Sequence, residues 1–308
     1  MNRFLTAAVI AAVLILGIVV GVIRRDEGTL PEERGNETLS IGTTECRRVV
    51  SMAPNITETL LALGLGDRVV GVTRFCTYPP EALGKQSVGG YLDPNYEIIA
   101  SLRPDMVFLL PEQENVRTML GELDIHTETV RNRTVAEILE TIRYIGARCG
   151  AGREAGLLIA DIEKRIETVR ARTAGVMSPR VLISVSRDYD VSGVQRMYAA
   201  GPNTFFDELI GDAGGRNAYK GPAIAYPVLS MEGIISLNPD VIIDLVPPDQ
   251  AVKTNKMQLA EAWASLGDVT AVRSGRVYVI DADYATVPGP RFISFLEDLT
   301  DIIHDREE

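Results

Sequence analysis

The sequence predicts an α/β protein with two Rossmann-like lobes, each a mainly parallel sheet with flanking helices, joined by one long α-helix. The main observation is an internal repeat, because the segment YEIIASLRPD at residues 96–105 recurs in similar form as MEGIISLNPD at residues 231–240. A second is the alternation of strand and helix patterns in both halves, which is typical of parallel sheets with helices on both faces. A third is an amphipathic helical pattern at 151–174, between the halves. Two similar halves predict two lobes with a cleft between them.

Each copy of the repeat predicts a short helix followed by a buried strand. Asn95 and Ser230 stand at the expected N-cap positions, where their side chains can accept a hydrogen bond from a helix N–H group. A proline near the end of each phrase stops the helix, and an apolar run follows at 106–110 and at 241–245. We therefore expect the same helix–strand unit once in each lobe.

The rest of the first half continues the strand–helix alternation. Asn55 with Glu58 predicts a capping-box variant at the start of the first helix, and Gly64 and Gly66 mark its end. The expected strands cover 49–53, 68–72 and 127–130. The expected helices cover 55–63, 114–123 and 135–147, with a helical turn after Pro79 and Pro80.

The segment between the halves predicts one uninterrupted helix. Leu158, Ile162, Ile166 and Val169 recur at helical spacing, with charged residues elsewhere, over about six turns at 3.6 residues each. A single helix is stiffer than the crossing strands of a flexible hinge. We therefore expect the cleft to close only slightly when a ligand binds.

The second half repeats the alternation and ends in an amphipathic helix. The Gly-rich segment at 212–216 follows a helix instead of opening one, so it indicates a helix stop. The expected strands cover 181–185, 241–245 and 276–280, and the expected helices cover 205–210 and 291–303.

The N-terminus predicts attachment to a membrane. Residues 6–23 form an apolar run flanked by arginines, which is short for a membrane span and long for the core of a signal peptide. We expect an uncleaved anchor, with a cleaved export signal as the alternative, followed by a polar tether. The expected bounds are 1–25 for the anchor or signal, 26–46 for the tether, 47–150 for the N-terminal lobe, 151–175 for the inter-lobe helix and 176–304 for the C-terminal lobe.

Composition and cysteine count exclude several classes of function. The net charge of −11 argues against a nucleic-acid-binding protein, which normally presents a basic face. Cys46, Cys76 and Cys149 leave at least one thiol unpaired, and the spacing does not decide whether two of them pair. Only two histidines occur, far apart, so a Cys/His metal cage is not expected.

Three stretches together resemble a known family. RRVVSMAPNITETLLALGLGDRVVGVTRFCTYPPEA, VGGYLDPNYEIIASLRPDMV and SMEGIISLNPDVII, in this order with the long helix, are similar to the cobalamin- and iron-chelate-binding subunits of ABC importers over roughly residues 47–300. The resemblance implies an extracytoplasmic, monomeric protein that captures a bulky metal chelate in the inter-lobe cleft. A corrinoid is the first expectation, a ferric siderophore the second and haem the third, so cobalt or iron arrives with the ligand and no cofactor is expected.

The resemblance also implies a partner, namely a permease dimer with its ATPase. In the resembled family one glutamate from each lobe meets arginines on the two permease subunits, and Glu97 and Glu232 occupy these places in the repeat. The plainer interpretation is that each glutamate only complements a helix dipole, for about 0.3–1 kcal/mol.

Tyrosines at equivalent places in the repeat are the main ligand-binding candidates. Tyr91 and Tyr226 each lie six residues before the repeated glutamate, and two aromatic rings facing each other across a cleft could stack on a large planar ligand. Each could equally be a half-buried core residue. The resemblance, or proximity to these positions, adds six further candidates, each with a plain structural alternative: Arg74, Phe75, Tyr198, Asp283, Tyr284 and Arg291.

Two other functions stay open. An anchored sensor or scavenger of the same fold would need no transporter, and the glutamate pair argues against it. An α/β enzyme is less favoured, because the sequence contains no G-x-S-x-G, no helix-opening GxGxxG and no P-loop. No catalytic residue is therefore assigned.

Overall fold

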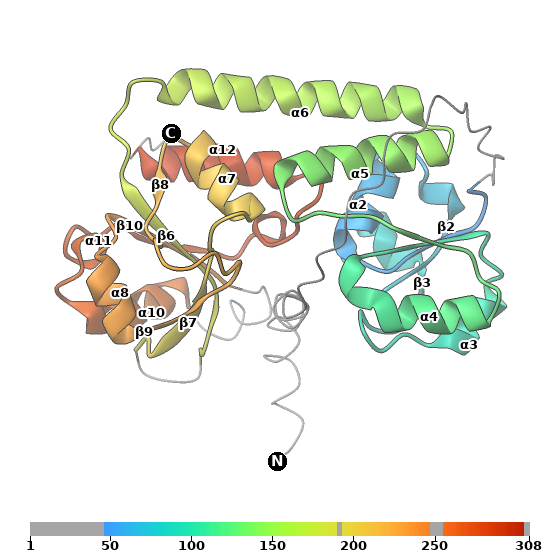
Figure 1. Cartoon of the computed structure of the whole chain (residues 1–308), viewed down its shortest axis with the longest axis horizontal. Helices are drawn as coiled ribbons and strands as arrows, with labels where there is room; N and C mark the ends of the chain where they lie inside the picture. Colours follow the sequence, from blue (N-terminus) through green and yellow to red (C-terminus); the bar gives the residue numbers. More distant parts are fainter. Residues whose placement is uncertain (1–45, 190–192, 247–254, 305–308) are drawn as a thin grey trace, which may run out of the picture.

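The computed structural model describes residues 46–189, 193–246 and 255–304, and it confirms the predicted fold class. Two α/β lobes lie side by side under one long helix, α6 (Gly152–Thr173), which spans both of them (Figure 1). The predicted anchor at 6–23 and the tether before Cys46 lie outside the described residues. Within the described ranges, no helix is both long and apolar enough to cross a membrane.

The N-terminal lobe contains a five-stranded sheet in the order β3-β2-β1-β4-β5, and every pair of neighbouring strands is parallel. Parallel neighbours need a crossover between them, which the helices of this lobe supply. The strands are β1 (Val49–Ser51), β2 (Val69–Val72), β3 (Gln86–Ser87), β4 (Met106–Leu109) and β5 (Thr127–Thr129). The helices are α2 (Pro54–Ala62), α3 (Tyr96–Ser101), α4 (Glu114–Glu122) and α5 (Val135–Arg148).

The C-terminal lobe contains a mixed sheet in the order β11-β10-β6-β7-β9, with β8 paired to β6. β10 is parallel to β6 and β11, as expected, whereas β7 is antiparallel to both of its neighbours, β6 and β9. The strands are β6 (Arg180–Arg187), β7 (Arg196–Ala199), β8 (Arg216–Asn217), β9 (Val228–Ser230), β10 (Val241–Leu245) and β11 (Val277–Ile280). The helices are α7 (Phe205–Asp212), α8 (Met231–Leu237), α10 (Lys256–Glu261), α11 (Thr270–Arg273) and α12 (Phe292–Ile303).

Strand residues feed alternate cores because successive side chains point to opposite faces of a sheet. In β4, Met106 and Phe108 join the large core beneath α6, whereas Val107 and Leu109 join a smaller core on the other face. Both faces of each sheet are therefore covered, which explains why the strands read as continuous apolar runs.

The α6 helix packs against α5 of one lobe and α12 of the other. Its buried face includes Ile159, Ile162, Ile166 and Val169, in agreement with the predicted stripe. Arg165 adds a link to the C-terminal lobe by donating to Glu297 of α12, with N–O distances of 2.9 and 2.6 Å. The predicted inter-lobe helix is thus present and held on both sides.

Two local features differ from, or complete, the sequence interpretation. The capping box predicted for Asn55 and Glu58 is wrong, because the N-cap of α2 is Ala53, which caps without a side-chain hydrogen bond. The helix instead starts with Pro54, whose ring is compatible with a first turn. The cysteines that the spacing left undecided are resolved by a disulfide between Cys46 and Cys149, with Cys76 buried as a free thiol.

Candidate functional site

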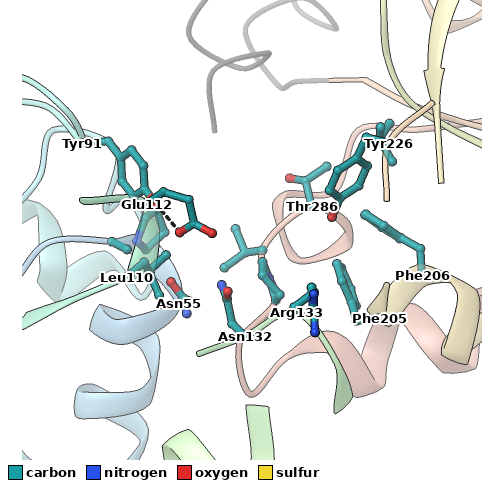
Figure 2. A pocket seen from close by; sticks show the side chains of 15 residues that line it. Asn55, Tyr91, Leu110, Glu112, Asn132, Arg133, Phe205, Phe206, Tyr226 and Thr286 are labelled. Atoms are coloured by element: carbon teal, nitrogen blue, oxygen red, sulfur yellow. Dashed lines mark hydrogen bonds between the residues drawn. The ribbon is translucent and has the colours of Figure 1, made fainter. Parts of the chain in front are cut away.

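A cavity lies between the lobes, at the carboxyl ends of the parallel strands. Open α/β sheets commonly bind ligands at this edge, where loops from several strands converge. The cavity contains about 760 Å³ of space free of protein atoms, which includes open solvent. Figure 2 shows side chains from both lobes pointing into it.

The wall from the N-terminal lobe is largely polar. Its residues follow β1, β3, β4 and β5, and they bring amide, carboxylate, guanidinium and phenol groups to the cavity. The Tyr91 hydroxyl donates to Oε2 of Glu112 at 3.2 Å. The residues of this wall are Ala53, Pro54, Asn55, Tyr91, Leu110, Glu112, Asn132 and Arg133.

A buried glutamine fixes the positions of Tyr91 and Glu112. Gln113 donates from its amide nitrogen to the carbonyl oxygens of Tyr91 at 2.7 Å and Met52 at 3.1 Å. Its amide oxygen accepts from the Leu110 N–H at 2.8 Å. This side chain is 1% exposed and joins the turn after β4 to the two neighbouring loops. Its three hydrogen bonds hold this part of the wall in place before any ligand arrives.

The wall from the C-terminal lobe is mainly aromatic and aliphatic. Phe205 and Phe206 begin α7, and their rings lie 4.0 Å apart between centroids. Tyr226 lies in the loop before β9 and faces the cavity from the side opposite Tyr91 (Figure 2). The residues of this wall are Val185, Phe205, Phe206, Tyr226, Thr286, Val287 and Pro288.

Both tyrosines enter the cavity as neutral phenols. Burial raises the pKa of the Tyr91 hydroxyl and of the Tyr226 hydroxyl well above the ordinary value of 10.0, and the Glu112 carboxylate raises both further. Arg133 opposes this effect at Tyr226. At neutral pH both hydroxyls therefore keep their protons, and that of Tyr91 is donated to Glu112.

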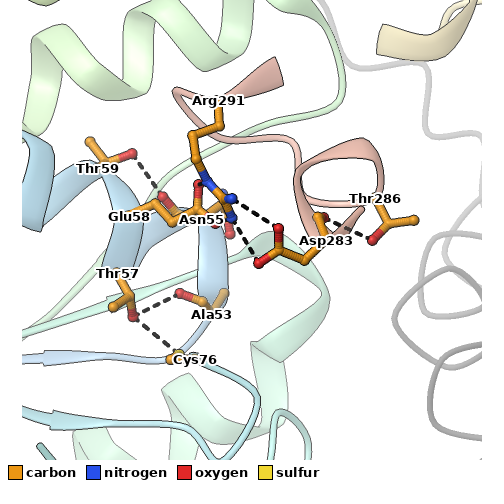
Figure 3. Close-up of polar contacts among 9 residues, drawn as sticks. All are labelled: Ala53, Asn55, Thr57, Glu58, Thr59, Cys76, Asp283, Thr286 and Arg291. Carbon is orange, nitrogen blue, oxygen red and sulfur yellow. Dashed lines mark hydrogen bonds and ion pairs between the residues drawn. The ribbon is translucent and has the colours of Figure 1, made fainter. Parts of the chain in front are cut away.

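Beside the cavity, an ion-pair cluster crosses from one lobe to the other. Arg291, just before α12, donates to the Glu58 carboxylate of α2 with Nε–Oε2 at 3.0 Å, and to Asp283 with Nη1–Oδ1 at 2.9 Å (Figure 3). The Glu58 side chain is 3% exposed and that of Arg291 18%. Burial raises the pKa of Glu58, while the contacts with Arg291 act in the opposite direction. The Arg291 guanidinium also lies over the Tyr78 ring, 3.5 Å from its centroid.

A second polar contact joins the lobes next to this cluster. Oε2 of Glu208, in α7, accepts from the backbone N–H of Val135 at the start of α5, at 2.6 Å. A carboxylate is favourable at this place because the N-terminus of a helix carries partial positive charge. Together with Glu58 and Arg291, this contact restrains the relative position of the two lobes.

The structure brings Tyr91 and Tyr226 together, and it places the other six ligand candidates outside the lining of this cavity. Arg74 pairs with Asp93 at 2.9 Å and lies over the Phe75 ring, which is half-buried against the core. Tyr198 is a half-buried residue of β7. The Tyr284 hydroxyl donates to Asp298 at 2.6 Å, and Arg291 donates to both Asp283 and Glu58.

The two docking candidates occupy equivalent places. Glu97 and Glu232 are exposed residues in the first turns of α3 and α8. The N-caps are those predicted: Asn95 accepts from the N–H of Ile98, and Ser230 from the N–H of Gly233. Helices α3 and α8 lie on different lobes, both on the side of the molecule away from α6 (Figure 1).

Most of the polar wall was not identified from the sequence. Glu112, Asn132 and Arg133 had no repeat partner and no ligand-binding motif to single them out. One signal was available, because each follows a predicted strand by a few residues, and the carboxyl ends of parallel strands meet at one edge of a sheet. Glu58 was misread as a helix cap, although its actual partner lies 233 residues away in the chain.

Comparisons with known proteins agree with this architecture. The uncharacterized ABC transporter substrate-binding lipoprotein YvrC of Bacillus subtilis is 29% identical over 281 residues, which cover 89% of this chain and 84% of that protein. The vitamin B12-binding protein of Vibrio cholerae is 27% identical over 253 residues, covering 81% of this chain and 86% of that protein.

Solved structures are similar over the same region. The apo form of the periplasmic heme-binding protein RhuT from Roseiflexus sp. RS-1 superposes with a TM-score of 0.72 at 28% identity, over 84% of this chain and 98% of that one. The family model described as periplasmic binding protein matches residues 49–284, which is most of the chain. This chain belongs to the periplasmic binding protein family.

Proposed function

We propose that this protein is an extracytoplasmic solute-binding protein that captures a bulky metal chelate in the inter-lobe cavity and delivers it to an ABC importer. The observation that carries the proposal is the cavity itself, with Tyr91 and Tyr226 entering from opposite lobes beside Phe205 and Phe206. Aromatic rings on two sides suit a large ligand with flat faces, and the polar wall supplies groups that fix its orientation.

A corrinoid is the ligand class that the cavity favours first. Corrinoids carry peripheral amides, which can pair with Asn55, Asn132 and the two phenols, whereas haem carries carboxylates that need cations. A ferric siderophore is the second choice and haem the third. Relatives whose names state vitamin B12 binding and cobalamin binding support this order, while the heme-binding structural relatives keep haem in the test.

The disulfide supports an extracytoplasmic location for this protein. Cys46 and Cys149 pair, and protein disulfides persist mainly in oxidising compartments. We propose that residues 6–23 attach the protein to the cell membrane, or serve as a cleaved export signal. The lipoprotein name of the Bacillus subtilis relative is consistent with a membrane-attached receptor.

The proposed partner is a permease dimer with its ATPase. Glu97 and Glu232 are exposed on equivalent helices of the two lobes. The two negative charges are therefore placed so that a twofold-symmetric permease could bind each with a basic patch on one of its subunits. Such contacts set orientation and association rate more than affinity.

The ligand proposal is tested by a binding screen. The full chain in detergent, with the disulfide intact, is titrated by calorimetry with cyanocobalamin, dicyanocobinamide, haem and several ferric siderophores. We expect sub-micromolar binding of a corrinoid. Binding of none of these compounds would reject the ligand class and leave the fold unaffected.

The docking proposal is tested in an importer reconstituted with the cognate permease and ATPase. The double variant Glu97→Lys/Glu232→Lys should bind ligand normally and lose nearly all uptake, because like charges would face each other at two sites. Glu114→Lys/Glu122→Lys is a matched control, with the same change of charge on the surface of α4. Normal uptake by the first variant would mean that the two glutamates serve only their helices.

A further inference from the structure

Among the described residues that line the cavity, Glu112 is the only acidic one and Arg133 the only basic one. The Glu112 side chain is half-buried in the turn after β4, and the Tyr91 hydroxyl reaches only its Oε2 atom. In Figure 2 the carboxylate points into the space between the lobes, toward the side from which Tyr226 enters. Oε1 is therefore left facing the place of a ligand.

The position of this carboxylate is set by its neighbours. Gln113, the next residue, holds the turn through three buried hydrogen bonds, one of them to the backbone of Tyr91. The Glu112 carboxylate also raises the pKa of the Tyr226 hydroxyl on the opposite lobe, after burial, and Arg133 lowers it. A charge held in this way discriminates between ligands, because it cannot turn away from an unfavourable group without breaking its contacts.

Little positive charge balances Glu112. The Arg133 side chain belongs to an exposed residue at the edge of the cavity. Arg291 is close by, but its guanidinium is already paired with Glu58 and Asp283. A ligand carboxylate beside Glu112 would thus meet a like charge in a partly desolvated place, where Coulomb repulsion is much stronger than in water.

We infer that Glu112 is a specificity-determining residue, which accepts a hydrogen bond from an N–H donor on the rim of the chelate and rejects a chelate that presents a carboxylate at the same point. The inference rests on the proposed function and deepens it by assigning the chemistry of the ligand rim. Recognition of this kind combines a favourable contact with a repulsive one, which is how specific sites commonly separate similar ligands.

The test compares ligands that differ in one group. Cyanocobalamin and its separate monocarboxylic acids, each with one peripheral amide hydrolysed, are titrated by calorimetry into the full chain and into Glu112→Gln. We expect at least one acid to bind the wild type roughly 10- to 100-fold more weakly than cyanocobalamin, as suits a hydrogen bond to a charged group. In Glu112→Gln this ratio should fall to within about threefold.

Two further variants isolate the charge. Glu114→Gln makes the same change two residues away, on an exposed side chain that pairs with Arg117, and it should keep the wild-type ratio. Tyr91→Phe removes the hydrogen bond that orients the Glu112 carboxylate but leaves its charge, so the ratio should lie between those of the wild type and Glu112→Gln. Loss of the ratio in Glu114→Gln would attribute discrimination to the net charge of the protein and overturn the inference.

The outcomes separate this inference from the proposed function. If the wild type binds cyanocobalamin and all its acids equally, or if Glu112→Gln keeps the wild-type ratio, the role of Glu112 is rejected and the proposed function stands. If haem binds in place of cyanocobalamin, the same comparison is made between haem and haem dimethyl ester, and Glu112 should favour the ester. If no chelate binds at all, the proposed function fails and this inference fails with it.

Discussion

The two lobes share one frame and differ in what they present to the cavity. In the N-terminal lobe, Asp105 accepts from the backbone N–H of Arg48 at 3.1 Å, and the Arg48 side chain donates to the carbonyl of Leu102. In the C-terminal lobe, Asp240 accepts from the backbone N–H of Arg180 at 2.8 Å, and Arg180 donates to the carbonyl of Leu237. The aspartate and the leucine of the repeat thus accept the same hydrogen bonds from an arginine in each lobe.

The walls of the cavity do not follow this symmetry. One lobe contributes mostly polar groups around Glu112, and the other contributes the Phe205–Phe206 pair with Tyr226. Tyr91 is engaged with Glu112, whereas Tyr226 donates to no partner within the described part of the chain. The comparison teaches that the repeat builds the scaffold, while the loops after each strand, which lie outside the repeat, decide the chemistry.

The largest expected effect concerns the covalent link that only the N-terminal lobe has among the described residues. The disulfide between Cys46 and Cys149 spans 103 residues. Replacing both cysteines by alanine should lower the free energy of unfolding by about 4 kcal/mol, because a long loop in the unfolded chain is no longer closed. Urea denaturation measures the change. A loss below about 1 kcal/mol would show that the disulfide does not stabilise this lobe. The same conclusion would follow if the oxidised and the reduced wild type had the same free energy of unfolding.

The next prediction concerns how much the Glu58–Arg291 ion pair between the lobes contributes to the free energy of unfolding. Arg291→Met leaves a 3%-exposed carboxylate without its partner, so it should cost about 3 kcal/mol at neutral pH. Burial already raises the pKa of Glu58, and removing Arg291 removes the opposing contacts and raises it further. A carboxyl group whose pKa is raised by folding contributes stability at low pH and loses it as the pH rises through the folded value.

The cost of Arg291→Met should therefore be small near pH 4.5 and grow toward pH 7.5. Urea denaturation over this range measures it. In the double variant Glu58→Gln/Arg291→Met the dependence on pH should largely disappear. A cost that stays constant with pH, or that is largest in acid, would contradict the role assigned to the buried carboxylate.

A smaller effect separates the aromatic wall from the polar wall. Tyr226→Ala should weaken every chelate that binds by about 2 kcal/mol, roughly 30-fold, because stacking does not depend on the groups at the ligand rim. Asn132→Ala should weaken only chelates with hydrogen-bonding groups at the rim, by about 1 kcal/mol. Calorimetric titration of both variants with cyanocobalamin and with iron etioporphyrin, whose rim carries only alkyl groups, decides the matter. The same pattern of loss in both variants would mean that the walls do not have separate roles.

The smallest expected effect is a change in shape. The α6 helix is continuous over 22 residues and packs on both lobes, and the contacts of Arg291 and Glu208 join the lobes at two further points. Ligand binding should therefore alter the radius of gyration in small-angle scattering only slightly, and Arg291→Met should increase the change. A large closure of the wild type, of the kind seen in hinged receptors, would show that these links open during binding.

Local sequence patterns were sufficient for the framework. Helical periodicity predicts α6, the repeat predicts α3 with β4 and α8 with β10, and side-chain type at the start of each repeat predicts Asn95 and Ser230 as caps. These features depend on neighbours within a few residues, where spacing and side-chain type decide the outcome. The antiparallel strands β7 and β9 were missed, because short segments form strands there only through their pairing in the sheet.

By itself, the sequence determined the two-lobed α/β class, the linking helix and the placing of Tyr91, Tyr226, Glu97 and Glu232 at equivalent positions. Tertiary structure alone decided the pairing of Cys46 with Cys149, the burial of Glu58 against Arg291 and the polar wall around Glu112. The physical reason is distance along the chain. Hydrophobic period and helix caps act within a turn or two, whereas a cavity is formed by loops that are remote in sequence and meet only when strands pair side by side.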